Sequence, residues 1–287
     1  MNDSYDRGAE DVGNIVALEH VNLCMPDQRV ATLFYISGLG FTRDPYLFTG
    51  LNVMWVNVGC NQFHLPTGAP QQLRGRVGLV VPDLDALAGR LEAVHGELAD
   101  TAFEFAAEGD RVEARCPWGN HIVCHAPDPR FGPVALGMAY VELDVAPGTA
   151  PGIARFYAEA LKAPVSAEEG VAVVAVGARQ SLVFRETGAA LPDYDGHHIQ
   201  IYVADFSGPH AWLKERGLVS EESDQHQYRF VDIVDPETGT VLTNLEHEVR
   251  SMTHPLYARP LVNRDPARSN TSFAVGREAR AWTLPPD

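Results

Sequence analysis

Four side chains able to bind a metal or move a proton lie in short apolar segments of this sequence. His20 and His198 begin the segments 20–25 and 198–203, while His64 and Glu246 lie within 62–65 and 244–247. Imidazole nitrogens and carboxylate oxygens hold catalytic transition metals, and imidazole exchanges protons near neutral pH. A metal-centred active site is therefore the first chemistry to consider.

These side chains belong to an order of segments that occurs four times. The opening strands begin at residues 20, 76, 140 and 198, so successive starts differ by 56, 64 and 58 residues. Short alternating or continuous apolar runs are typical of strands. Amphipathic helices are predicted at 27–37, 83–95, 149–161 and 205–216, with Asp83 and Asp205 as N-caps. Closing strands are predicted at 62–65, 123–126, 182–185 and 244–247.

The repeat predicts an α+β protein made of four βαβββ modules. A chain of 287 residues suits about two domains. We expect modules one and two to form the first domain, residues 16–130, and modules three and four the second, residues 136–248. Residues 249–287 fall outside the repeat and are expected to be an irregular C-terminal extension that packs over the modules or contributes a dimer contact.

The fourfold order resembles the vicinal oxygen chelate superfamily, which includes glyoxalases, bleomycin and fosfomycin resistance proteins, and extradiol ring-cleaving dioxygenases. The resemblance covers about Val16 to Glu248 and includes the Leu39–Phe41 motif and the Asp235–Gly239 turn. It implies that two modules pair into a U-shaped mixed sheet around a metal. It also implies that the ligands come from the first and last strands of each module.

The choice of paired modules decides which ligands this resemblance predicts. Modules three and four would supply Tyr140, His198 and Glu246, whereas modules one and two would supply His20, His64 and His125. Modules one and four would supply His20, His198 and Glu246, with His64 beside them. Two histidines and a carboxylate are the set that binds non-heme Fe(II) and leaves positions open. We therefore favour the pairing of modules one and four, with Arg76 and Phe184 at positions that cannot bind a metal.

The carboxylate ligand is less defined than the histidines. The run Leu245-Glu246-His247-Glu248 offers three polar side chains, and a slip of one residue exchanges the two faces of a strand. Glu246 is favoured, with His247 as the alternative. His197 is expected on the face opposite to His198.

By resemblance, the most favoured function is a non-heme Fe(II) dioxygenase that cleaves a small aromatic diol with O₂. His64 would then be the acid–base, and His226 and Tyr228 would contact the substrate. One alternative is a glyoxalase-like lyase or isomerase with His64 as a fourth ligand to Zn, Ni or Mn. A second alternative is a metal-free small-molecule binding protein.

Composition limits the partners. The formal net charge of −16 argues against nucleic acid and anionic membranes, which are polyanionic. The N-terminal residues are polar and do not form the apolar segment of a signal peptide. The four cysteines show no CxxC spacing. Reduced thiols and a cytoplasmic location are therefore expected. Repeated modules are also compatible with a homodimer.

Overall fold

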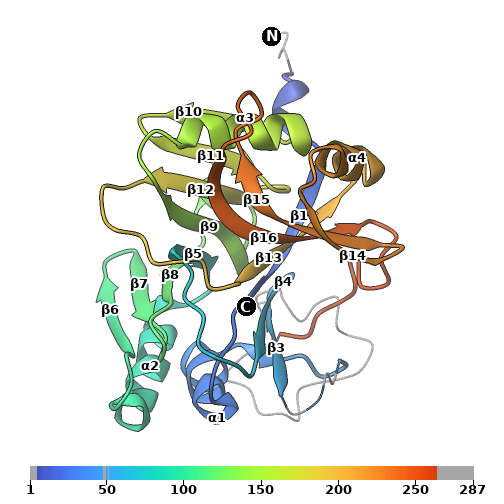
Figure 1. The fold of residues 1–287 in the computed structure, drawn as a ribbon. Coiled ribbons are helices and arrows are strands. Elements are labelled where there is room, and N and C mark those ends of the chain that lie inside the picture. Colours follow the sequence, from blue (N-terminus) through green and yellow to red (C-terminus); the bar gives the residue numbers. More distant parts are fainter. Residues whose placement is uncertain (1–4, 48–49, 51, 264–287) are drawn as a thin grey trace.

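The computed structural model describes residues 5–47, 50 and 52–263, and Figure 1 shows their arrangement. The described chain forms two eight-stranded mixed sheets with helices packed against them. This confirms the predicted α+β fold built from paired βαβββ modules.

All four modules have the predicted order of one strand, one helix and three strands. Module one contains β1 (Ile15–Asn22), α1 (Gln28–Ala31) continued by a π-helical segment (Thr32–Gly38), β2 (Thr42–Arg43), β3 (Val53–Val58) and β4 (Asn61–Pro66). Module two contains β5 (Gly75–Val80), α2 (Leu84–Leu98), β6 (Glu104–Glu108), β7 (Arg111–Arg115) and β8 (His121–His125). Module three contains β9 (Gly137–Val145), α3 (Ala150–Ala160), β10 (Val165–Glu168), β11 (Val171–Ala175) and β12 (Ser181–Glu186). Module four contains β13 (His198–Val203), α4 (Ser207–Glu215), β14 (Val219–Asp224), β15 (Gln227–Val234) and β16 (Val241–Ser251).

The two sheets join modules that are not consecutive in the chain. One sheet has the order β14-β15-β16-β13-β1-β4-β3-β2 and therefore combines modules four and one, and the other has the order β10-β11-β12-β9-β5-β8-β7-β6 and combines modules three and two. The grouping of 16–130 and 136–248 as separate paired-module domains is thus corrected, because each range contributes half of each sheet. The pairing of modules one and four favoured by the ligand argument is the one observed.

The two modules of a sheet meet through their opening strands. β1 runs antiparallel to β13, whereas within each module the opening and closing strands, such as β1 and β4, run parallel. Across β1 and β13, His20 pairs with Gln200 and Asn22 pairs with His198. A local two-fold axis at the Val21–Ile199 pair exchanges these two pairs, so His20 and His198 occupy equivalent positions.

The helices cover the sheets with apolar faces. In α2, the buried residues are Leu87, Leu91, Val94 and Leu98, whose spacing of three and four places them on one face. The Asp83 carboxylate accepts a hydrogen bond from the Ala86 N–H at 2.8 Å, which confirms the predicted N-cap. At α4 the Asp205 carboxylate accepts from the Gly208 N–H at 3.0 Å, although the helix itself begins after Phe206. None of the helices in the described residues is long and apolar enough to cross a membrane.

After β16 the chain returns to module one. We call residues 252–263 the strap, and the predicted extension beyond residue 263 lies outside the described residues. Leu261 and Val262 are buried, and Asn263 exchanges two hydrogen bonds with the main chain of Gly59. The strap therefore ties the end of module four to the outer strands of module one.

Candidate metal centre

Three donor side chains meet on one face of the sheet formed by modules one and four. Ligand atoms of His20, His198 and Glu248 all lie within 4.8 Å of one another. They come from β1, β13 and β16, which are adjacent in the sheet. Two imidazoles and one carboxylate at this separation can close around a single transition-metal ion.

The structure places Glu248 in this group, where the sequence favoured Glu246. Glu248 Oε2 lies 3.7 Å from His198 Nε2, and Glu246 Oε1 lies 3.6 Å from His198 Nδ1, so both carboxylates flank this ring. Residues two apart in a strand share a face, so alternation alone does not choose between them. The distance to His20 does choose, because the group of mutually close ligand atoms contains His20, His198 and Glu248.

The local two-fold axis gives the reason for this two-residue difference. In module one His64 pairs with Asn22, and in module four Glu248 pairs with Gln200. Because the axis exchanges Asn22 with Gln200, Glu248 is the counterpart of His64. The four equivalent positions around the axis are therefore His20, His64, His198 and Glu248.

The protonation states suit metal binding. Burial lowers the pKa of His198 to about 3 and lowers the pKa of His20 well below its ordinary value, so both rings are neutral at pH 7 and keep a lone pair. The His20 side chain is fully buried, and neither of its ring nitrogens has a hydrogen-bond partner among the described residues, although Glu19 Oε2 lies 3.5 Å from Nδ1. A buried imidazole without partners is costly, and coordination of a metal would satisfy one of these nitrogens. The residues present therefore fit a metal ion.

Two arginines hold the carboxylates of this centre. Arg229 contacts both Glu246 and Glu248, and Arg250 Nη2 lies 2.5 Å from Glu248 Oε1. Arg250 Nη1 also lies 3.3 Å from Glu19 Oε2. Burial raises the pKa of Glu248, and the neighbouring arginines oppose that shift. Arg229 was not predicted as a site residue, and Arg250 was assigned to the C-terminal extension. Both lie on strands whose alternation places them beside the acidic residues, which was the available signal.

His64 lies against His20 but outside the group of three. The His64 ring stacks on His20 with centroids 3.6 Å apart and on Trp55 with centroids 3.9 Å apart. Its Nε2 lies 3.0 Å from Gln62 Oε1. Burial is the largest cause that lowers the pKa of His64 well below its ordinary value. The ring is thus held on both faces and at one edge, and it is neutral at pH 7.

The two predicted substrate contacts, His226 and Tyr228, lie outside the group of three donors. The Tyr228 ring is buried against Phe206 and His210, on the side of β15 that faces α4. Its neighbour Arg229 faces the metal-binding group, so the candidate centre contains Arg229 and not Tyr228. His226 lies in the turn between β14 and β15, where its Nδ1 is 3.3 Å from Thr253 Oγ1. No contact joins His226 to the three donors in the described chain.

The remaining histidines considered from the sequence have structural surroundings. His247 is buried between Tyr157, whose hydroxyl lies 2.7 Å from Nε2, and Phe230, which stacks on the ring. This placement excludes His247 from the face that carries Glu246 and Glu248. His197 bonds to Asp195 through Nδ1 at 2.7 Å. His125 bonds to the Tyr140 hydroxyl at 3.0 Å, in the other sheet.

The sheet of modules two and three has no equivalent donor set. Arg76 pairs with Glu142 across β5 and β9, and Gly78 pairs with Tyr140. By the equivalent local axis of this sheet, the four central positions are Arg76, Val123, Tyr140 and Val183. Neither Arg nor Val supplies a metal ligand. Arg76 and Arg185 instead pair with the Glu142 carboxylate, at 2.5 and 3.2 Å.

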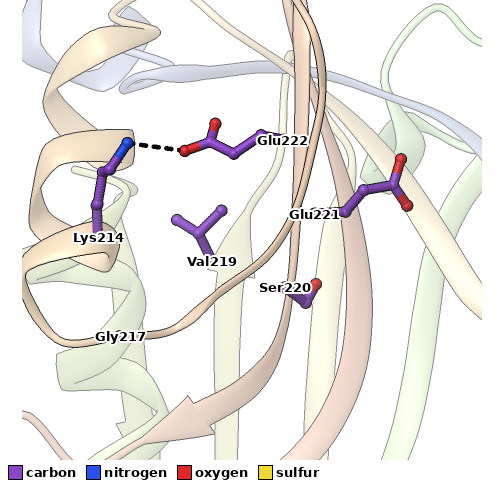
Figure 2. A pocket seen from close by; sticks show the side chains of 6 residues that line it. All are labelled: Lys214, Gly217, Val219, Ser220, Glu221 and Glu222. Atoms are coloured by element: carbon purple, nitrogen blue, oxygen red, sulfur yellow. Dashed lines mark hydrogen bonds and ion pairs between the residues drawn. The ribbon is translucent and has the colours of Figure 1, made fainter.

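A shallow depression between α4 and β14 offers a different surface, shown in Figure 2. Its lining residues are Lys214, Gly217, Val219, Ser220, Glu221 and Glu222. Lys214 Nζ lies 2.9 Å from Glu222, and Glu221 lies 3.7 Å from Arg229. Its charged groups are therefore already paired within the chain.

Comparison with solved structures places this arrangement among known folds. Glyoxalase I from Zea mays matches with a TM-score of 0.55 and 14% identity, over 82% of this chain and 92% of the other. Its V278E mutant gives a TM-score of 0.56 and 12% identity, over 85% and 94%. A "putative dioxygenase" from Bacillus subtilis subsp. subtilis str. 168 gives 0.54 and 14%, over 84% and 86%. The chain has the vicinal oxygen chelate fold.

This vicinal oxygen chelate fold is recognised from structure alone. No family model matches the sequence, and no curated protein matches it. The likeness confirms the fold expected from the fourfold repeat. At 12–14% identity these likenesses concern the fold, and the chemistry has to be argued from the residues of the centre.

Proposed function

We propose that this protein is a metal-dependent enzyme whose centre consists of His20, His198 and Glu248, and that it oxidises a small aromatic diol with O₂. The observation that carries this proposal is the group of two imidazoles and one carboxylate within 4.8 Å. Three protein ligands leave coordination positions free, as non-heme Fe(II) oxygenases require. A bound iron would supply Lewis-acid and redox chemistry toward the diol and O₂.

The surrounding residues would prepare the site and move the proton. Glu248 is held between Arg229 and Arg250, which fix the position of its carboxylate. His64 has a neutral ring, and no described residue bonds to its Nδ1. In the proposed reaction His64 Nδ1 accepts the proton of a substrate hydroxyl, and the diol enters as an anion. The Trp55 ring supports the opposite face of His64 from His20.

A second candidate function is a glyoxalase-like lyase or isomerase with Zn, Ni or Mn. The specific observation in its favour is that His64 occupies the position equivalent to Glu248, so four ligand positions surround the local axis. Four ligands would suit Lewis-acid chemistry without O₂. Against this, the three donors that lie closest exclude His64, and the His64 and His20 rings are stacked. A metal-free binding protein would leave the buried His20 nitrogens, which have no hydrogen-bond partner among the described residues, without a role.

The experiment for this proposal uses iron-loaded protein, prepared without oxygen, and a panel of catechols and hydroquinones. The proposed activity predicts O₂ consumption with at least one diol, and loss of that consumption in His198→Ala. Conversion of a 2-oxoaldehyde–thiol adduct by the nickel- or zinc-loaded protein, with no O₂ consumption under iron, would favour the second candidate.

A further inference from the structure

We propose that a hydrogen-bond chain starting in the strap fixes the tautomer of His64, with the proton on Nε2 and the lone pair on Nδ1. This inference deepens the proposed function, because His64 can act as a base only through a nitrogen that carries a lone pair. The chain runs from Val262 through Asn57 and Gln62 to His64. Each step follows from which atoms can donate and which can only accept.

The first step is the contact between the strap and β3. Asn57 Nδ2 donates to the main-chain carbonyl of Val262 at 2.9 Å, inside the buried region. A carbonyl oxygen can only accept, so the amide nitrogen of Asn57 must face Val262. The Asn57 oxygen, Oδ1, is then directed to the other side. There it accepts a hydrogen bond from Gln62 Nε2 at 2.6 Å.

The second step fixes the orientation of the Gln62 amide through a contact with Asp44. Gln62 Nε2 also donates to Asp44 Oδ2 at 3.0 Å. The Asp44 carboxylate accepts from the main-chain N–H groups of Tyr46 and Leu47, at 2.9 and 3.0 Å, and it pairs with Arg259 of the strap. A carboxylate beside a guanidinium accepts and does not donate. Both hydrogens of the Gln62 amide therefore have acceptors.

The third step transfers this polarity to the imidazole. With its NH₂ group facing Asn57 and Asp44, Gln62 directs Oε1 to His64 Nε2 at 3.0 Å. This oxygen can only accept, so His64 Nε2 must carry the proton. A neutral imidazole holds a single N–H, and the contact with Gln62 Oε1 places that proton on Nε2. Nδ1 consequently keeps its lone pair.

Gln62, Asn57 and Asp44 are thus positioning residues for His64. The strap also helps to position His64. Val262 supplies the carbonyl and Arg259 the positive charge that together determine the direction of donation along the series of hydrogen bonds. Leu261 and Val262 are buried, so docking of the strap is part of the folded core. Val262 lies 198 residues from His64 in the sequence. Through this contact the strap determines which nitrogen of the His64 ring keeps its lone pair.

The test is a nitrogen-15 NMR measurement on the full-length, metal-free chain near pH 7.5. Long-range proton–nitrogen correlations distinguish a protonated ring nitrogen from one with a lone pair, and His64→Gln identifies the His64 signals. We expect Nε2 at the shift of a protonated nitrogen and Nδ1 at that of an unprotonated one. The opposite assignment in the wild type, or averaged shifts from a mixture, would overturn the inference without any variant being needed.

A variant then tests the cause. Gln62→Leu removes the acceptor at Nε2, and both His64 nitrogens should move toward averaged shifts. Gln180→Leu is a matched control, because it removes another partly buried amide that bonds to the main chain of Leu18 and Met138. Unchanged His64 shifts in a folded Gln62→Leu protein would assign the tautomer to some other cause and contradict the proposal.

The tautomer and the proposed function fail separately. A protein with the expected tautomer that consumes no O₂ with any diol would retain the hydrogen-bond chain and lose the dioxygenase assignment. An active dioxygenase with the proton on Nδ1 would support the proposed function and contradict the proposed series of hydrogen bonds.

Discussion

The imidazole rings of His20 and His64 stack with their centroids 3.6 Å apart and their planes at 24°. In this arrangement one ring is a member of the three-donor group and the other is not. Each lone pair lies in the plane of its own ring, and two nearly parallel planes separated by a stacking distance disfavour convergence of both lone pairs on one ion. In the proposed function the stack separates the ligand His20 from the proton carrier His64, and the distinction can be measured.

His64→Gln should leave the metal bound and remove the proton transfer. General acid–base groups contribute roughly 10²–10⁴-fold to rate, and a loss of that size in kcat is expected with the best diol substrate. Metal content measured on the same preparation distinguishes the roles. A loss of metal together with activity would identify His64 as a fourth ligand and support the second candidate function.

The choice between two neighbouring carboxylates is tested by Glu248→Gln beside Glu246→Gln. Glu248 lies in the three-donor group, so its neutral variant should weaken iron binding by at least about tenfold. Glu246 contacts Arg229 and should affect binding less. Titration with Fe(II) under nitrogen measures both. A larger defect in the Glu246 variant would restore the ligand assignment made from sequence.

Tyr228 should be dispensable for chemistry. Its ring is buried against Phe206 and His210, and its hydroxyl is buried without a partner in the described chain. Tyr228→Phe should leave turnover and metal content unchanged and raise the free energy of unfolding by up to about 1 kcal/mol. A strong loss of turnover in a stable Tyr228→Phe protein would show that the hydroxyl reaches the substrate.

Acid should destabilise the fold partly through His247. Burial lowers the pKa of His247 to about 3, whereas the unfolded chain binds its proton near 6.5. Between these values the unfolded state holds one more proton, so the free energy of unfolding falls as pH decreases from about 6.5 toward 3. One proton amounts to about 2 kcal/mol between pH 6.5 and 5. Above pH 6.5 this contribution is constant.

Urea unfolding of the wild type and of His247→Gln at pH 7.5 and 5 isolates this contribution. Glutamine does not titrate and keeps an acceptor for the Tyr157 hydroxyl. The decrease in unfolding free energy between the two pH values should therefore be smaller in the variant by about 2 kcal/mol. Equal decreases in the two proteins would show that His247 does not titrate on unfolding in this range.

The repeat made the fold predictable. Strand and helix patterns recur at nearly constant spacing, and the structure has all four modules in the predicted order. The pairing of modules was less accessible, because the antiparallel contact between β1 and β13 joins residues about 180 apart. In the sequence, only the donor residues indicated modules one and four, since Tyr140 and Arg76 leave modules three and two without complete donor sets.

The candidate site was predictable where equivalent residues lie near the start of a module. His20 and His198 begin segments with similar patterns, and the structure places them in equivalent positions. The closing strand of module four continues to Ser251, so its register could not be counted from one end. Glu246 and Glu248 share a face, and they are distinguished by the pairing of Glu248 with Gln200 and by the place of Glu248 in the three-donor group. Tyr228 was expected near the substrate by resemblance alone, and the structure places its neighbour Arg229 on the face of the centre.

The most direct measurement of the central claim is elemental analysis of anaerobically purified protein, with the wild type beside His198→Ala. The proposed centre predicts about one iron per chain in the wild type and its loss in the variant. One zinc, nickel or manganese ion lost in the same way would keep the centre and favour the second candidate chemistry. Full retention of metal in His198→Ala, or no metal in either protein, would contradict a centre made by His20, His198 and Glu248.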